Sequence, residues 1–217
     1  MRKHIALTAA VTLGAMIAPL SAHAVQMNSA APVTTPQTNV IEIKADAGAQ
    51  TFITNMADKA ISFLGNEGYS QDQKEAEFRR LLKASFDMKT IGRFALGRYW
   101  GTATAQQQQE YLSLFESMVV DVYAQRFNEY KGQKLEVASA RPDNNDTLVT
   151  SHIVAPGGGD KVQVDWRVRN KGGTYKIVDV IIEGVSMSLT QRSDFSSVIQ
   201  QGGGDVQALL VHLRGKQ

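Results

Sequence analysis

The sequence predicts an α+β fold in which several helices come first, an antiparallel sheet follows, and short helices close the chain. Apolar residues recur at steps of three and four over residues 46–130, which is typical of helices. They recur at every second residue over 134–182, which is typical of strands, and helical spacing returns over 190–214. Because the helices and strands are segregated along the chain, the pattern favours α+β over an alternating α/β architecture.

The first 24 residues have the layout of a secretory signal. Arg2 and Lys3 precede an apolar stretch that ends in the small-x-small triplet 22–24. That stretch is shorter than the roughly 20 apolar residues of a membrane-spanning helix. Residues 25–45 are small and polar and contain proline, so they are predicted to be a flexible tether. We therefore expect a protein that leaves the cytoplasm, does not span a membrane, and folds over residues 46–217.

The composition excludes several classes of protein. The chain has no cysteine, so disulfides and a lipid-modified cysteine anchor are both excluded. It has 23 Lys and Arg against 21 Asp and Glu, and removal of Arg2 and Lys3 with the signal leaves 21 of each. A chain without basic excess is a poor candidate for nucleic-acid binding.

Four helices are predicted before residue 130. The second and fourth begin at capping boxes, formed by Ser70 with Gln73 and by Thr104 with Gln107. The first and third end at glycines. The expected spans are about 52–64, 71–86, 88–96 and 105–130.

Four strands are predicted, with connections rich in Pro, Gly, Asn and Asp that indicate an antiparallel meander. In the third strand Val162, Val164, Trp166 and Val168 alternate with polar residues, so one face is expected to be dry and the other wet. In the fourth strand we assign Ile177 and Ile181 to the same dry face. The expected spans are 134–141, 147–155, 161–169 and 174–182.

No set of residues predicts catalysis or metal binding. The segment around Ser186 lacks the second glycine of a nucleophile elbow, so Ser186 is interpreted as a hydroxyl at a turn or at the start of a helix. Asp179 stands between two valines in an apolar strand. It has the setting of a general acid or base, or of a structural carboxylate held by the Trp166 indole N–H, a backbone amide or an arginine. We favour the structural interpretation.

A series of basic residues lies between positions 79 and 98. Two interpretations stay open: a solvated helix face, or a surface that contacts anionic headgroups or a partner protein. The series consists of Arg79, Arg80, Lys83, Lys89, Arg93 and Arg98.

Two separate stretches, 96–137 and 166–213, resemble the MlaC family of soluble periplasmic phospholipid carriers, also known as toluene-tolerance auxiliary proteins. The resemblance covers about residues 46–214. The chain departs from the family pattern at Gly101, where a basic residue is usual, and at Thr190-Gln191, where an asparagine-tyrosine pair is usual. The matching residues include Gly97, Tyr99, Trp100, Phe115, Tyr123, Arg167, Asp179, Gly184, Ser186, Arg192 and Phe195.

The resemblance implies a curved four-stranded antiparallel sheet with helices packed over one face, enclosing an apolar cavity for lipid acyl chains. It implies a monomeric periplasmic carrier that exchanges phospholipid with an inner-membrane Mla-type ABC transporter complex and an outer-membrane lipoprotein–porin complex. Phospholipid would be its cargo, and no cofactor is expected.

Three sets of site residues are predicted on this basis. The cavity lining is Tyr99, Trp100, Phe115, Met118, Val122, Val164, Trp166, Val168, Ile177 and Ile181. The structural or rim residues are Arg167, Asp179 and Ser186. The partner-docking residues are Arg80, Lys83, Arg93 and Arg98.

Two other functions stay open from the sequence. One is a binding or assembly protein whose apolar groove takes a partner's helix. The other is a small-molecule enzyme that uses Asp179. Co-purification of phospholipid would support the carrier alone.

Overall fold

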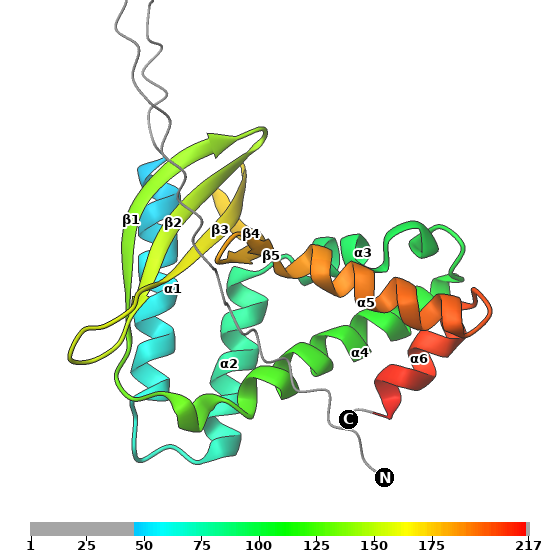
Figure 1. The fold of residues 1–217 in the computed structure, drawn as a ribbon, viewed down its shortest axis with the longest axis horizontal. Helices are drawn as coiled ribbons and strands as arrows, with labels where there is room; N and C mark the ends of the chain where they lie inside the picture. The colour runs from blue at the N-terminus through cyan, green and yellow to red at the C-terminus, as the bar shows by residue number, and fades with distance from the viewer. Residues whose placement is uncertain (1–45, 216–217) are drawn as a thin grey trace, which may run out of the picture. The chain divides into compact units, whose positions relative to one another are not determined.

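The computed structural model describes residues 46–215 (Figure 1). The predicted signal sequence and tether lie outside these residues. The helices are α1 (Ala47–Leu64), α2 (Gln71–Ser85), α3 (Met88–Leu96), η1 (Gly97–Trp100), α4 (Ala105–Ala124), η2 (Phe127–Glu129), α5 (Met187–Gln201) and α6 (Val206–Arg214). The strands are β1 (Lys134–Asp143), β2 (Asp146–Val154), β3 (Val162–Lys171), β4 (Thr174–Ile182) and β5 (Val185–Ser186). The α+β class is confirmed.

The two predicted capping boxes are present. The Ser70 hydroxyl accepts a hydrogen bond from the Gln73 amide at 3.2 Å, and the Gln73 side chain accepts one from the Ser70 amide at 2.8 Å. Thr104 and Gln107 make the same pair of bonds at 3.2 and 3.0 Å. Each box satisfies two amides that the first helical turn leaves without partners, which is why α2 and α4 begin there.

The strands form one antiparallel sheet in the order β1-β2-β3-β4-β5. One face packs against α1 and α2 and is called the inner face. Its residues include Val149, Val168 and Ile177, which are at most 1% exposed. The two-residue strand β5, which pairs with the end of β4, was not predicted, because two residues give no periodic signal.

A bulge in β4 changes which side chains reach the inner face. Arg167 pairs with Asp179, whereas the next residue, Val168, pairs with Ile177, so Val178 is an extra residue in β4. Since side chains alternate along a strand, one extra residue reverses the face of everything beyond it.

The assignment of Ile181 to the inner face is therefore wrong. Ile181 pairs with Asp165 on the outer face. Val180 and Ile182, which pair with Trp166 and Val164, hold the inner-face positions instead. The outer face is not uniformly wet either: Asp165 is only 8% exposed.

The apolar residues form two separate cores. The sheet core joins α1 and α2 to the inner face of the sheet, and comprises Ala49, Ile53, Met56, Phe63, Leu81, Val149, Val168 and Ile177. The helical core joins α3, η1, α4, α5 and α6, and its largest fully buried side chains are Tyr111, Leu96, Ile199, Leu209, Leu210 and Leu213. In Figure 1 these helices gather away from α1.

Helix α4 belongs to the helical core only along its first part. Phe115 and Met118 lie in that core, but Val122, one turn after Met118, is 49% exposed. The buried residues near the end of α4 are Val120 and Ala124, on a different side of the helix. Val122 is thus not part of the buried face of α4, and α4 ends at Ala124 instead of near 130.

Helix α5 is longer than predicted. It begins at Met187, where the Ser186 hydroxyl caps it by accepting a hydrogen bond from the Leu189 amide at 3.2 Å. No helix over the range 46–215 has the length and apolar character needed to cross a membrane.

Candidate functional site

The chain crosses between the two cores at three places. Phe86 packs against the sheet core and Met88 against the helical core. Val119 packs against the helical core, whereas the Phe127 ring contacts two rings on the sheet side. The third crossing runs from Val180 to Phe195. We call the three crossing segments, 86–88, 119–127 and 180–195, the seam.

Two of the three seam segments, 119–127 and 180–195, carry exposed apolar side chains. Val122, Tyr123, Val185 and Leu189 are 43–55% exposed. They are four of the nine large apolar side chains classed as exposed in the described part of the chain. Exposed apolar side chains mark surfaces that bind apolar ligands or partners, so the seam, in which they are enriched, is the candidate site.

The predicted cavity residues are divided between the two cores. Tyr99, Phe115 and Met118 are buried in the helical core, and Trp100 packs against it. Val168 and Ile177 are buried in the sheet core, with Trp166 against it, and Val164 is 2% exposed. Ile181 lies on the outer face of the sheet, and Val122 is exposed on α4 within the seam. The structure thus brings the remaining eight together as two groups, one on each side of the seam.

A buried serine holds the Trp166 ring on the inner face. The Trp166 indole N–H donates to the Ser151 hydroxyl at 2.9 Å, and that hydroxyl donates to the Val164 carbonyl at 2.9 Å. Ser151 is fully buried, so these two hydrogen bonds satisfy polar groups that would otherwise be unpaired among apolar side chains. Sequence reasoning missed Ser151, since its only signal is a small polar residue among apolar ones in β2.

Asp179 anchors the start of α5 to the end of β4. One carboxylate oxygen accepts hydrogen bonds from the Val180 amide at 2.9 Å, the Ser188 amide at 3.1 Å and the Ser188 hydroxyl. The other accepts from the Ser186 hydroxyl at 2.6 Å. Trp166 is not a partner, because the bulge places Asp179 on the outer face.

Arg167 lies on the outer face, away from the apolar groups. It forms an ion pair with Asp143, and the neighbouring Arg169 donates two hydrogen bonds to Asp146 at 2.7 and 2.9 Å. These pairs fasten the β1–β2 hairpin to β3. Arg167 and Asp179, which are partners in the strand register, thus serve different contacts.

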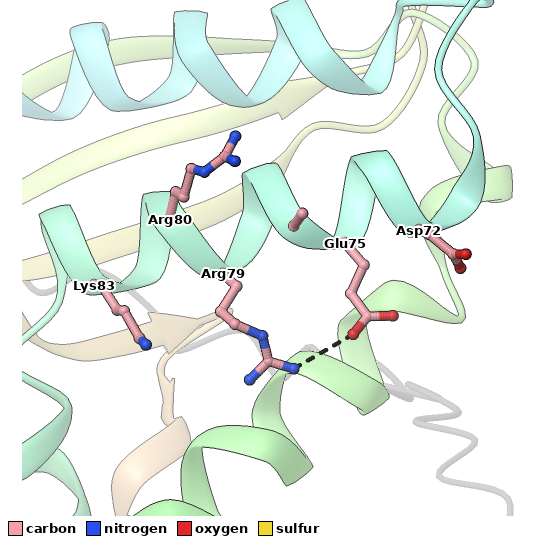
Figure 2. A pocket seen from close by; sticks show the side chains of 6 residues that line it. Asp72, Glu75, Arg79, Arg80 and Lys83 are labelled. Carbon is pink, nitrogen blue, oxygen red and sulfur yellow. Dashed lines mark hydrogen bonds and ion pairs between the residues drawn. The ribbon is translucent and has the colours of Figure 1, made fainter.

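Two hollows stand out in the described part of the chain, and neither is an apolar cavity. One, of about 380 Å³, lies along α2 and is shown in Figure 2. The other, of about 290 Å³, lies by the ends of β1 and β2. The first is lined by Asp72, Glu75, Ala76, Arg79, Arg80 and Lys83. A lining of this charge suits no acyl chain.

The predicted docking residues fall into two environments. Arg80 and Lys83 of α2 form ion pairs with Glu77 and Glu116. Arg93 lies over the Trp100 ring, and Arg98 lies over the ring of the adjacent Tyr99. The single basic series in the sequence is thus two different surfaces.

Within residues 46–215, no cluster of three His, Cys, Asp or Glu side chains is placed to hold a metal ion.

These features define an α+β protein with an antiparallel sheet, two apolar cores and an apolar seam between them. The family model described as "MlaC protein" matches residues 54–215. The chain belongs to the MlaC family.

Two curated relatives are similar over part of the chain. The intermembrane phospholipid transport system binding protein MlaC of Haemophilus influenzae is 26% identical over 123 residues, which are 55% of this chain and 58% of that protein. The toluene tolerance protein ttg2D of Pseudomonas putida is 26% identical over 109 residues, which are 50% of this chain and 51% of that protein. The chain thus spans little more than half the length of these relatives.

A solved structure is similar over more of the chain. It is a phospholipid-binding protein from Ralstonia solanacearum, determined in complex with a phospholipid. The match has a TM-score of 0.67 and 26% identity, and it covers 77% of this chain and 96% of that one.

Proposed function

We propose that this protein is a periplasmic phospholipid carrier. It takes phospholipid from one membrane complex and delivers it to another, with an inner-membrane Mla-type ABC transporter and an outer-membrane lipoprotein–porin complex as its partners. The observation that carries the proposal is the likeness to the phospholipid-bound protein from Ralstonia solanacearum, which extends over 96% of that chain. Membership of the MlaC family and the name of the Haemophilus influenzae relative support it.

The acyl chains lie in the seam. On the sheet side they contact Trp166, Val180 and Ile182, and on the helical side Val119 and Val122. This placement is favoured because apolar side chains on both sides of the seam are exposed or only partly buried. An acyl chain that lies between the two cores covers the side chains of both sides at once. The headgroup stays near solvent.

Burial of the acyl chains accounts for the need for a carrier. At about 0.8 kcal/mol per methylene, two chains of roughly 15 methylenes each gain on the order of 20 kcal/mol when they leave water. Release into water is correspondingly slow, so delivery requires a docked partner that offers the lipid another apolar environment.

The test is lipid retention by two matched variants. Val122 lies in the seam and Val211 lies on α6 outside it, and both are exposed valines on helices, at 49% and 57%. The mature protein and the variants Val122→Asp and Val211→Asp are purified without detergent, and bound lipid is measured by native mass spectrometry.

We expect phospholipid on the unsubstituted protein and on Val211→Asp, and much less on Val122→Asp, because a carboxylate beside an acyl chain is costly. Equal lipid on both folded variants would show that the seam is not the site. Absence of phospholipid from the unsubstituted protein would contradict the carrier itself.

A further inference from the structure

Three basic residues of α2, Arg79, Arg80 and Lys83, are paired with acidic neighbours. Arg79 lies 3.4 Å from Glu75, and Arg79 and Lys83 lie 3.8 and 3.3 Å from Glu116 of α4. Arg80 is paired with Glu77. Figure 2 shows Arg79, Lys83, Glu75 and Asp72 on one side of α2 and Arg80 on the other. This surface therefore offers little free positive charge to a partner.

A second group of arginines lies over aromatic rings instead of beside carboxylates. It comprises Arg93 over Trp100 at 5.2 Å, Arg98 over Tyr99 at 4.9 Å, and Arg192 over Phe94 at 5.3 Å. None of these three arginines has a carboxylate within ion-pair distance among the described residues. A ring holds a guanidinium in place but leaves its full charge available.

Exposed apolar side chains accompany these arginines. Phe94 is 42% exposed and lies under Arg192, which joins α3 to α5. Leu189, 55% exposed, lies one turn before Arg192 on α5. Figure 1 shows α3 and α5 side by side. We call Arg93, Arg98, Arg192, Phe94 and Leu189 the arginine surface.

We propose that the arginine surface binds directly to the anionic headgroups of a lipid bilayer. The three arginines contact lipid phosphates, whose charge is complementary to theirs, and guanidinium groups bind phosphate oxygens in pairs. Phe94 and Leu189 enter the boundary between headgroups and acyl chains, where apolar side chains flanked by cations are favourable. Leu189 belongs to the seam, so this contact brings the seam against the membrane.

A bilayer suits this surface better than an acidic protein does. Tight protein interfaces centre on anchors that fill pockets, and neither of the two hollows lies on this surface. Single apolar side chains separated by arginines need a partner that adapts to them, which a fluid headgroup layer does. The inference goes beyond the proposed carrier, because a carrier that met only protein complexes would need no membrane contact.

The test is flotation of the mature protein with vesicles of phosphatidylcholine alone or mixed with phosphatidylglycerol. We expect binding only to the mixed vesicles, with a loss of binding as salt is raised. A cation near an anionic membrane surface contributes about a fivefold increase in partition, so R93Q/R192Q should bind about thirtyfold more weakly. Melting curves verify that each variant is folded, and Arg98→Gln provides an independent single variant with about a fivefold loss.

The chain supplies matched controls. R80Q/K83Q removes the same charge from the neutralised α2 surface and should bind like the unsubstituted protein. Leu189→Ser should weaken binding, whereas Val211→Ser, at an equally exposed apolar residue of α6, should not.

Three outcomes would overturn the proposal. They are no flotation with mixed vesicles at low salt, an equal loss in both double variants, and unchanged flotation of R93Q/R192Q with impaired lipid transfer to detergent-solubilised acceptor complexes. The last result would assign the surface to protein docking. Flotation measures binding to membranes and not the bound cargo. A failed flotation test would therefore leave the proposed carrier function standing, because lipid retention tests that function separately.

Discussion

The anchoring of α5 by Asp179 can be tested with Asp179→Asn. Four donors point at this carboxylate: the amides of Val180 and Ser188 and the hydroxyls of Ser186 and Ser188. The amide keeps one acceptor oxygen but places an NH₂ group opposite the Ser186 hydroxyl, and it removes the negative charge from every bond. Ser188 is 5% exposed, so water replaces these bonds poorly.

The expected loss in the free energy of unfolding follows from the four hydrogen bonds to Asp179. A hydrogen bond to a charged group contributes about 1.5–3 kcal/mol and one between neutral groups about 0.5–1.5 kcal/mol. Loss of charge across four bonds is partly offset because a neutral amide costs less to desolvate than a carboxylate. We therefore expect the free energy of unfolding to fall by about 2 kcal/mol, which for a domain of this size lowers the melting temperature by roughly 4–8 °C.

The assay is thermal unfolding followed by circular dichroism, with Asp194→Asn as the control. Asp194 is exposed on the same helix, so its substitution should leave the melting temperature unchanged. Lipid retention by folded Asp179→Asn should persist, because the carboxylate lies on the outer face. A melting temperature equal to that of the unsubstituted protein would refute the reasoning. If such a variant had also lost a measurable turnover, the interpretation of Asp179 as an enzyme's acid or base would be favoured.

Two further predictions concern the helical part of the chain. The Tyr111 hydroxyl is buried and donates to the Gly92 carbonyl at 2.9 Å, so Tyr111→Phe should lower stability by about 1–3 kcal/mol, measured by urea unfolding against Tyr69→Phe at an exposed tyrosine. Burial acts to raise the pKa of Asp87, but hydrogen bonds from Thr90 and nearby positive charges outweigh it and hold the pKa below its ordinary value of 3.8. A lowered pKa stabilises the fold above the pKa of the unfolded chain, and this contribution disappears as the pH falls through the lower folded-state pKa. Melting temperatures measured from neutral to acid pH should therefore fall less in Asp87→Asn than in the unsubstituted protein, and parallel curves would contradict this role.

Much of the secondary structure was predictable because its signals act over a few residues. The capping boxes at Ser70 and Thr104 fix where α2 and α4 begin, and the α3 span was predicted as 88–96. The span of β4 was predicted as 174–182, in agreement with the structure. A cap or an alternation of side chains depends on neighbours in the chain, so the sequence displays it directly.

The errors come from contacts between distant segments. The Ile181 assignment failed because the bulge at Val178 is set by pairing with β3, and no feature of β4 alone reveals it. The exposure of Val122 was not visible in the sequence, because it depends on where α4 leaves the helical core.

The sequence by itself determined the class of fold, the starts of α2, α3 and α4, the family resemblance and the presence of a carboxylate that needs partners. Only the tertiary structure decided that the apolar residues form two cores with a seam, that Asp179 serves α5, and that one basic series is half neutralised and half free. The reason is physical. The spacing of apolar residues and the capping of a helix depend on neighbours in the chain, whereas the exposure of a side chain and its charge partners depend on groups that folding brings together from far along the chain.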